Sequence, residues 1–260
     1  MNETIQVILR RRSRRMYADK PLESLHRNAI LRAALRAPTA GNLMLYSIIE
    51  ITDQELKEKL AVTCDNQPFI ASAPLVLLFA ADYQRWWDYF QQTGAPQRAL
   101  DLGIQPRKPQ AGDLVLACCD ALIAAQTAVI AAESLGVGSC YIGDILENAE
   151  TVRQLFNLPR HTFPVTLLCF GYPRSTPSAP QTSRFDQRFI VHQNSYHRLN
   201  STELGEMMQP LEQRFSANPP PQSMAQNAGQ ATYLRKFAAD FSVEMNRSVH
   251  AWLKAWEDEE

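Results

Sequence analysis

Residues 114–143 read LVLACCDALIAAQTAVIAAESLGVGSCYIG, and this stretch decides the fold class. Up to Leu135 it is rich in Ala, Leu, Val and Ile with almost no charge, and Gly136 is a natural helix terminator. A helix that is apolar on all sides must lie at the centre of a protein. Residues 138–143 then predict a short strand that opens into a loop.

The flanking segments alternate between the two kinds of secondary structure. Strands are expected at 47–52, 74–81 and 164–170, where the last two are continuous apolar runs typical of strands buried on both faces. Helices are expected at 4–12, 22–37, 53–63 and 150–156. Strands that alternate with helices imply an α/β or α+β sandwich.

The composition of the sequence changes after about residue 200. Residues 216–230 contain a Pro triplet and many small polar residues, which predicts an extended linker. Residues 231–256 are again helical in pattern, with an apolar stripe that must dock on the core or on a partner subunit. The stripe comprises Leu234, Phe237, Phe241, Met245, Val249, Trp252 and Trp256. We therefore expect a core at 1–200, a linker or excursion at 201–230 and a docking helix at 231–260.

Composition and charge argue against several classes of function. The net charge of −1 provides no overall field for nucleic acid or for an anionic membrane. We expect no stretch long and apolar enough to span a bilayer, and the N-terminus makes a poor signal peptide. The five cysteines form no CxxC pair and the histidines form no HExxH motif, which disfavours a metal site and favours a reducing cytoplasm.

The most informative local feature is the run Arg10–Arg15, which holds five arginines and Ser13. Guanidinium groups match phosphate oxygens bidentately, and a serine hydroxyl can bind another oxygen, so a mononucleotide phosphate is a natural ligand. Two other interpretations stay open. The run can be a solvated basic face, or it can bind nucleic acid or a phosphopeptide.

Several motifs in the same order along the chain resemble the nitroreductase family, and in particular its NADPH-dependent nitroreductase and flavin-reductase branch. They are RRSRR at 11–15, APTAGNLMLY at 37–46, AAESLGVGSCYIGDI at 131–145, LPRHTFPVTLLCFGYP at 158–173 and RFDQRFIVHQNSY at 184–196. The similarity covers about residues 5–200, and motifs in a shared order are far more specific than any one alone.

The resemblance implies an α+β fold with a central, mostly antiparallel sheet flanked by helices, and a C-terminal helical extension. It implies a homodimeric enzyme that binds FMN. The expected reaction is ping-pong: hydride passes from NAD(P)H to FMN, and electrons then pass to nitroaromatics, quinones, azo compounds or free flavin. The flavin supplies the redox chemistry, so no protein side chain is expected to act as a catalytic acid or base.

The resemblance also assigns cofactor-binding residues. It places Arg11, Arg12, Ser13 and Arg15 at the FMN phosphate and ribityl end, joined by Arg184. It places Thr39, Asn42 and Gln67 near the isoalloxazine ring or ribityl chain, although ordinary turn and surface polarity would also account for Asn42 and Gln67. It places Tyr141, Ile142, Gly143 and Asp144 in a loop beside the reactive flavin nitrogen, where a residue without Cβ lets the backbone approach a flat ligand.

Some residues depart from the family pattern. Met44 stands where many relatives carry glutamine, and Thr182 stands where the branch often has lysine. The candidates for an NADPH 2′-phosphate contact are Arg214, Arg235 and Lys236, so we predict a mild preference for NADPH.

One alternative is excluded and two questions stay open. The dinucleotide-binding motif GxGxxG is excluded, because Tyr141 occupies the third glycine position and the glycines follow a helix. A specialised flavoenzyme, such as a dehalogenase or a flavin-cleaving enzyme, would carry the same FMN motifs. The aromatic segment 82–112 is either a packed helix or a determinant of acceptor choice.

Overall fold

The computed structural model describes residues 1–175, 181–218 and 224–258. The chain divides into two compact units, Met1–Pro177 with Glu244–Glu260, and Ser178–Val243. Each unit is described by itself.

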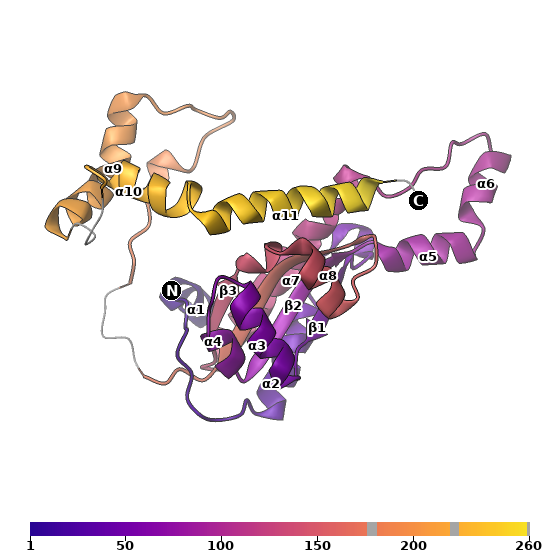
Figure 1. The fold of residues 1–260 in the computed structure, drawn as a ribbon, viewed down its shortest axis with the longest axis horizontal. Coiled ribbons are helices and arrows are strands. Elements are labelled where there is room, and N and C mark those ends of the chain that lie inside the picture. The colour runs from indigo at the N-terminus through magenta and orange to yellow at the C-terminus, as the bar shows by residue number, and fades with distance from the viewer. Residues whose placement is uncertain (176–180, 219–223, 259–260) are drawn as a thin grey trace. The chain divides into compact units, whose positions relative to one another are not determined.

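The first unit is built on one four-stranded antiparallel sheet in the order β1-β2-β4-β3 (Figure 1). Its strands are β1 (Tyr46–Glu50), β2 (Leu75–Asp82), β3 (Gly138–Ile142) and β4 (Thr162–Gly171). The expected α+β class with a mostly antiparallel sheet is confirmed. The four expected strands are all present, with ends shifted by two residues or fewer.

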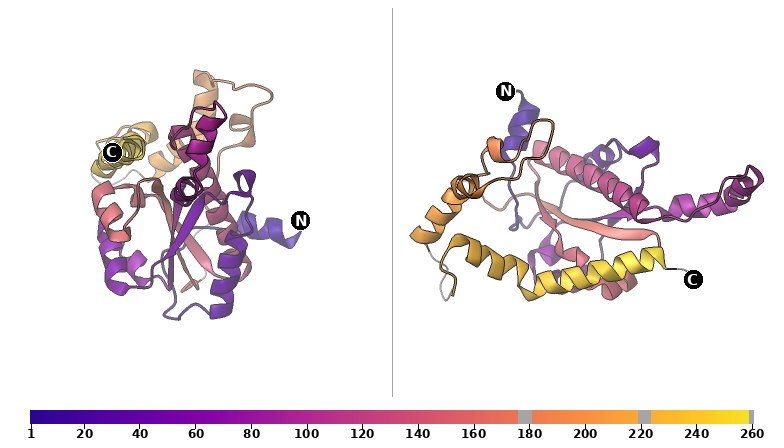
Figure 2. Two further views of the ribbon diagram at one scale, coloured as in Figure 1. Left: turned by 90° about the vertical axis from the view of Figure 1, so that its right-hand side faces the viewer. Right: turned by 90° about the horizontal axis from the view of Figure 1, so that it is seen from above.

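Helices cover both faces of the sheet (Figure 2). Along β2, Leu75, Leu77 and Phe79 belong to one hydrophobic core, while Val76 and Leu78 belong to the other. Every residue of β2 is buried, which confirms a strand buried on both faces. The alternation follows from the two-residue period of a strand.

Helix α7 (Ala111–Ser134) is the central helix that the sequence predicts. It contacts α2 (Ser24–Ala34), β2 and β4, and its small alanines permit close packing. Among the described residues, α7 alone has the length and composition needed to cross a membrane. The expectation that no stretch is long and apolar enough is therefore wrong on length and composition, while one face of α7 is part of the protein core.

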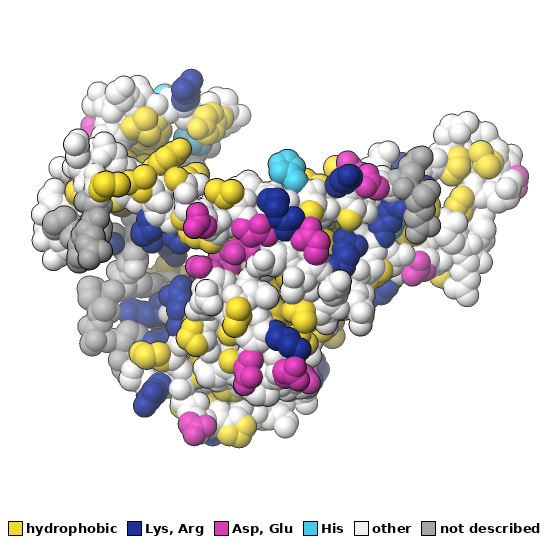
Figure 3. All heavy atoms as spheres, viewed as in Figure 1, with side chains coloured by type: hydrophobic (Ala, Val, Ile, Leu, Met, Phe, Trp, Pro, Cys, Tyr) yellow, Lys and Arg dark blue, Asp and Glu magenta, His cyan; other side chains and the backbone are white. Residues whose placement is uncertain are grey.

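The remaining helices of the first unit are short. They are α1 (Glu3–Arg10), η1 (Ala40–Asn42), α3 (Gln54–Thr63), α4 (Phe69–Ser72), α5 (Gln84–Gln92), α6 (Ala95–Asp101), η2 (Asp144–Leu146) and α8 (Ala149–Phe156). The aromatic segment predicted at 82–112 is thus largely the helix pair α5 and α6. Over the face drawn in Figure 3, acidic and basic side chains are interspersed, as the near-zero net charge predicts.

The second unit contains η3 (Gln187–Phe189), α9 (Ser201–Ala217), α10 (Ala228–Thr232) and η4 (Tyr233–Phe237). Of the predicted linker or excursion at 201–230, the first part is not an extended linker, because Ser201–Ala217 form helix α9. Asn200 and Glu203 form a capping box that satisfies backbone N–H groups at its start. The Pro triplet, Pro219–Pro221, lies outside the described residues.

Helix α11 (Asp240–Glu257) ends in the first unit, where it buries two tryptophans. Trp252 and Trp256 are each 1% exposed, and their rings pack edge-on against Phe163 and His161 of the same chain. In the earlier part of the predicted stripe, Leu234 and Phe237 are exposed. The predicted single helix is divided between α10, η4 and α11.

Candidate functional site

The arginine run is fixed against strand β3. The Arg14 backbone nitrogen donates to the Ser139 carbonyl oxygen at 2.8 Å, and Ser13 forms a parallel bridge with Ser139. Gly138 makes this approach possible, because a Cβ there would lie 2.5 Å from Cγ of Arg14. The glycine pair at 136–138 therefore ends a helix and receives the arginine segment, in place of any dinucleotide fingerprint.

Arg11 lies over the ring of Tyr141, with its guanidinium carbon 5.7 Å from the ring centroid. The Nε and Nη2 atoms of Arg11 are buried. Burial raises the pKa of the nearby Glu133 carboxyl, and Arg11 and Arg14 oppose that rise. Burial also raises the pKa of Tyr141 to about 12, with Arg11 again acting in the opposite direction. Two sequence-predicted residues, Arg11 and Tyr141, are thus brought together.

Arg15 continues the same electropositive surface toward α4. Its guanidinium carbon lies 5.9 Å from the Phe69 ring centroid. Burial raises the pKa of the Cys140 thiol, whereas Arg15, Arg11 and the Ser13 hydroxyl all act to lower it. Because one thiol senses all three groups, Arg11, Ser13 and Arg15 converge on one place beside β3. Guanidinium and hydroxyl donors in that arrangement can bind a phosphate.

Gln67 and Asp144 meet next to this surface. The Gln67 amide nitrogen donates to Oδ2 of Asp144 at 2.6 Å and to the Cys64 carbonyl oxygen at 2.9 Å. Asp65 and Asn66, both with positive φ, form the tight turn that directs Gln67 toward η2. Both acceptors are oxygen atoms, so the amide nitrogen must face them.

In the predicted flavin loop, the backbone is more available to a ligand than the side chains are. Ile142 is 1% exposed and belongs to the core, so only its backbone is available to a ligand. Gly143 has an ordinary φ of −77°, and a Cβ there would meet nothing within 4 Å. The backbone conformation therefore does not require glycine at this position, and the space beside it is open to a flat ligand.

Thr39 and Asn42 form a second group around η1. The buried carboxylate of Asp120 accepts from the backbone nitrogens of Ala40 at 3.0 Å and Leu45 at 3.2 Å. The Thr39 hydroxyl accepts from the Met44 nitrogen at 3.3 Å. Asn42 is exposed and has a φ of 58°, which asparagine tolerates better than most residues.

Helix α7 separates these two groups. Asp120 anchors the Thr39–Asn42 group, whereas Gln126 accepts a hydrogen bond from the Tyr141 hydroxyl at 3.1 Å and Glu133 lies near Arg11. A rise of 1.5 Å per residue places Asp120 about 9 Å from Gln126 and about 20 Å from Glu133 along the axis. One chain therefore presents the predicted site as two separated halves.

For two further predicted residues, Arg12 and Arg184, the structure gives the segment and the exposure. Arg12 lies in the same docked segment and is partly exposed. Arg184 is exposed and belongs to the unit Ser178–Val243, so its participation at the phosphate stays a prediction.

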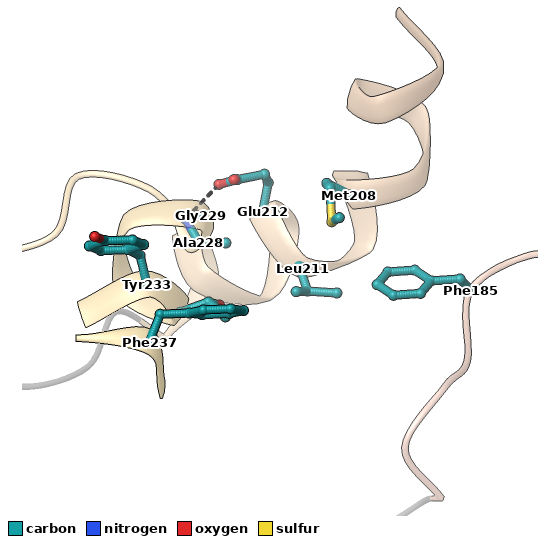
Figure 4. Close-up of a pocket in the computed structure, with 9 residues that line it drawn as sticks. Phe185, Met208, Leu211, Glu212, Ala228, Gly229, Tyr233 and Phe237 are labelled. Atoms are coloured by element: carbon teal, nitrogen blue, oxygen red, sulfur yellow. Dashed lines mark hydrogen bonds between the residues drawn. The ribbon is translucent and has the colours of Figure 1, made fainter. Parts of the chain in front are cut away.

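The second unit has a cavity of its own. About 370 Å³ in volume, it is lined mainly by apolar side chains (Figure 4). Glu212 is the acidic residue in its lining, and its carboxylate accepts from the Ala228 backbone nitrogen at 2.9 Å. Apart from Arg184, the polar and cationic groups described above belong to the first unit instead.

Sequence reasoning missed Asp120, Gln126 and Cys140. Asp120 could have been recognised in the sequence, since it is an isolated charge within the apolar stretch 114–132. Nothing in the sequence marks Gln126 or Cys140, because their importance depends on the strand and segment that pack beside them. Among the described residues, no cluster of three or more His, Cys, Asp or Glu side chains is arranged to hold a metal ion.

Comparisons with known proteins show the family and the fold of the chain. Residues 8–172 match the sequence profile of the family described as the Nitroreductase family. The chain is 34% identical over 200 residues to an oxygen-insensitive NADPH nitroreductase of Salmonella typhimurium, covering 77% of each chain. It is 30% identical to an NADPH-flavin oxidoreductase of Vibrio harveyi, covering 84% of each. The structure of B. megaterium NfrA2 superposes with a TM-score of 0.82 and 27% identity, covering 98% of both chains.

Proposed function

This chain belongs to the nitroreductase family, and we propose on that premise that it is an NAD(P)H-dependent FMN oxidoreductase that reduces nitro compounds or free flavin. The observation that carries the proposal is the convergence of Arg11, Ser13 and Arg15 beside β3, next to the Gln67–Asp144 pair. The first group suits a phosphate and the second suits the polar edge of a flat ring.

Each residue contributes binding or orientation. Arg11, Arg12, Ser13 and Arg15 would hold the phosphate and ribityl end, with Arg184 as a further candidate. Gln67, Asp144 and the backbone at Tyr141–Gly143 would border the ring on one side. Thr39 and Asn42 would border it on another. FMN, when bound, supplies the chemistry by accepting hydride from NAD(P)H and passing it to the second substrate in ping-pong order.

We propose that the active form is a homodimer. Helix α7 exposes an apolar stripe in which Val115, Leu116, Leu122 and Ile123 are 41–63% exposed. Such a stripe on one helix is typical of an interaction surface. An isologous dimer would repeat it on both copies and bring the Thr39–Asn42 half of one chain to the arginine half of the other. This arrangement would account for the separation of the two halves along α7.

We place the enzyme in the cytoplasm, in agreement with its free cysteines. For the donor, NADPH is proposed because the relatives named above are NADPH enzymes. Nitroaromatics, quinones, azo compounds and free flavin are the proposed acceptors.

Purification followed by a two-part assay tests the function. The protein should be yellow, release FMN on denaturation and oxidise NADPH when a nitroaromatic or free FMN is supplied. A colourless protein that does not bind added FMN, or one whose main ligand is a nucleic acid in a strongly salt-dependent manner, would contradict the proposal. A flavoprotein that reduces none of these acceptors would instead favour a specialised flavoenzyme.

A further inference from the structure

Glu147 follows η2 and is 5% exposed, and its surroundings are unusual for a carboxyl group. Its Oε1 atom is buried and makes no hydrogen bond within the part of the chain that the structure describes. The groups that act on the Glu147 carboxyl are acidic. It is hydrogen-bonded to the Asp144 carboxyl, and the carboxyl groups of Asp65 and Glu244 lie nearby. A buried carboxylate with no cation at hand is costly.

The charged groups around Glu147 leave it without neutralisation. The Glu244 carboxylate accepts from the Asn148 backbone nitrogen at 3.1 Å and is paired with Arg247. Arg247 also binds Glu150, so its donors are directed elsewhere. Burial, followed by Asp144, Asp65 and Glu244, raises the pKa of Glu147 from 4.5 to about 7. Burial, with Asp144 as the next cause, raises the pKa of the neighbouring Cys64 thiol to about 12, so the thiol adds no charge.

We propose that Glu147 is a positioning residue whose buried carboxyl group holds the Asp144 carboxylate, and that this acid pair fixes the Gln67 amide for cofactor binding. The inference rests on the proposed function, because it assumes that Gln67 meets the FMN ring. It adds a residue to which the family resemblance gave no role.

The pair determines which atom of Gln67 is left for a ligand. Both hydrogens of the Gln67 amide nitrogen have protein acceptors, Asp144 and the Cys64 carbonyl. Only the amide oxygen remains, and it can accept but cannot donate. It therefore suits the N–H group on the edge of an oxidised isoalloxazine ring. A protonated Glu147 holds the Asp144 carboxylate in place by donating to it.

Loss of the Glu147 proton should loosen this arrangement. With a pKa of about 7, we expect the Glu147 carboxyl to be mostly protonated at pH 6 and mostly ionised at pH 8.5. Two adjacent carboxylates then repel each other, with Asp65 and Glu244 adding to the repulsion. Asp144 shifts away from Gln67, and one hydrogen bond to the ring is weakened.

The test measures FMN affinity in the full-length chain, freed of flavin, by quenching of FMN fluorescence at pH 6 and pH 8.5. The variant Glu147→Gln keeps a donor to Asp144 and does not titrate. At each pH we take the ratio of the wild-type Kd to the Kd of the variant. This ratio should be about fivefold higher at pH 8.5 than at pH 6, which is the effect of one hydrogen bond. Titration of the FMN phosphate changes the Kd of both proteins equally, so it does not change the ratio. Glu58→Gln, a change at an exposed acid of α3, should follow the wild type.

A second measurement needs no folded variant. The infrared band of a protonated carboxylic acid should be present in the wild type at pH 6 and absent at pH 8.5. A ratio that stays within twofold, or no such band at pH 6, overturns the proposal. Wild-type protein that binds no FMN at either pH contradicts the proposed function instead, so the two failures are distinguishable.

Discussion

The two halves of the candidate site differ in how they are held. The arginine half is attached to a sheet edge by a backbone bridge and is joined to Tyr141, Phe69 and Cys140 by side-chain contacts. The Thr39–Asn42 half is joined to the buried Asp120 carboxylate, nearer the start of α7. The residues that follow it are also held by α5, because the Trp86 indole donates to the Leu43 carbonyl oxygen and Arg85 donates to that of Met44. One half is thus held along a strand edge, and the other is held by side chains of α7 and α5. The difference predicts which substitutions remove binding and which loosen a loop.

The largest expected effect comes from the arginine half. Replacing Arg11 and Arg15 together with alanine removes two charge-assisted contacts, each contributing roughly 1.5–3 kcal/mol. FMN affinity should therefore fall about 100-fold to 10,000-fold, because each 1.4 kcal/mol corresponds to about tenfold. Equilibrium titration with FMN measures the change, and circular dichroism should report an intact fold.

The matched control is Arg32→Ala with Arg36→Ala, which changes the charge equally at two exposed arginines of the α2 region. Its FMN affinity should equal that of the wild type. Equal loss in both double variants would show that net charge, and not the docked segment, governs binding.

The second prediction tests whether the two halves come from different subunits. The Arg11→Ala/Arg15→Ala protein and an Asn42→Ala/Thr39→Ala protein should each have little activity. After unfolding and refolding as an equal mixture, half of the symmetric dimers are mixed, and each mixed dimer has one intact site, so about one quarter of wild-type activity should return. Refolding each variant alone is the control. No recovery in the mixture would assign both halves to one chain.

The third prediction concerns the α7 anchor of the Thr39–Asn42 half. Asp120→Asn leaves one oxygen to accept from two backbone N–H groups, so one buried donor loses its partner. The free energy of unfolding should fall by about 1–3 kcal/mol, the cost of an unsatisfied buried group. Urea denaturation measures it, and Asp101→Asn on exposed α6 should have no effect. Unchanged stability would mean that the Trp86 and Arg85 contacts are enough to hold the 39–45 segment.

The sequence predicted what depends on local pattern. The strand at 74–81 was recognisable because a strand buried on both faces is a continuous apolar run, and the arginine run was recognisable because clustered guanidinium groups call for an anion. The role of Asp120 was not predictable, since its contact with Ala40 spans 80 residues. Helix α9 was missed because the change in composition after about residue 200, with the Pro triplet and small polar residues at 216–230, was interpreted as a linker or excursion, although a capping box lies at Asn200–Glu203. For Gly143, close approach of the backbone to a flat ligand stays a prediction, since its φ of −77° does not itself require glycine.

The smallest expected effect concerns the electron donor, which engages neither half of the FMN site directly. Arg214 lies in α9, and Arg235 and Lys236 lie in η4, and all three are exposed in the second unit. An exposed cation contributes little, about 0.2–1 kcal/mol, because water screens it. Removing one should therefore lower the preference for NADPH over NADH by about fivefold or less.

The test compares kcat/KM for both donors in wild type and in the three alanine variants, with Arg98→Ala on α6 as the exposed control. Because Lys236 lies over the Phe241 ring, 5.0 Å from its centroid, it is the best ordered of the three and should give the largest change. Equal efficiencies with both donors in the wild type would remove the preference, and a preference that survives all three variants would place the 2′-phosphate contact elsewhere.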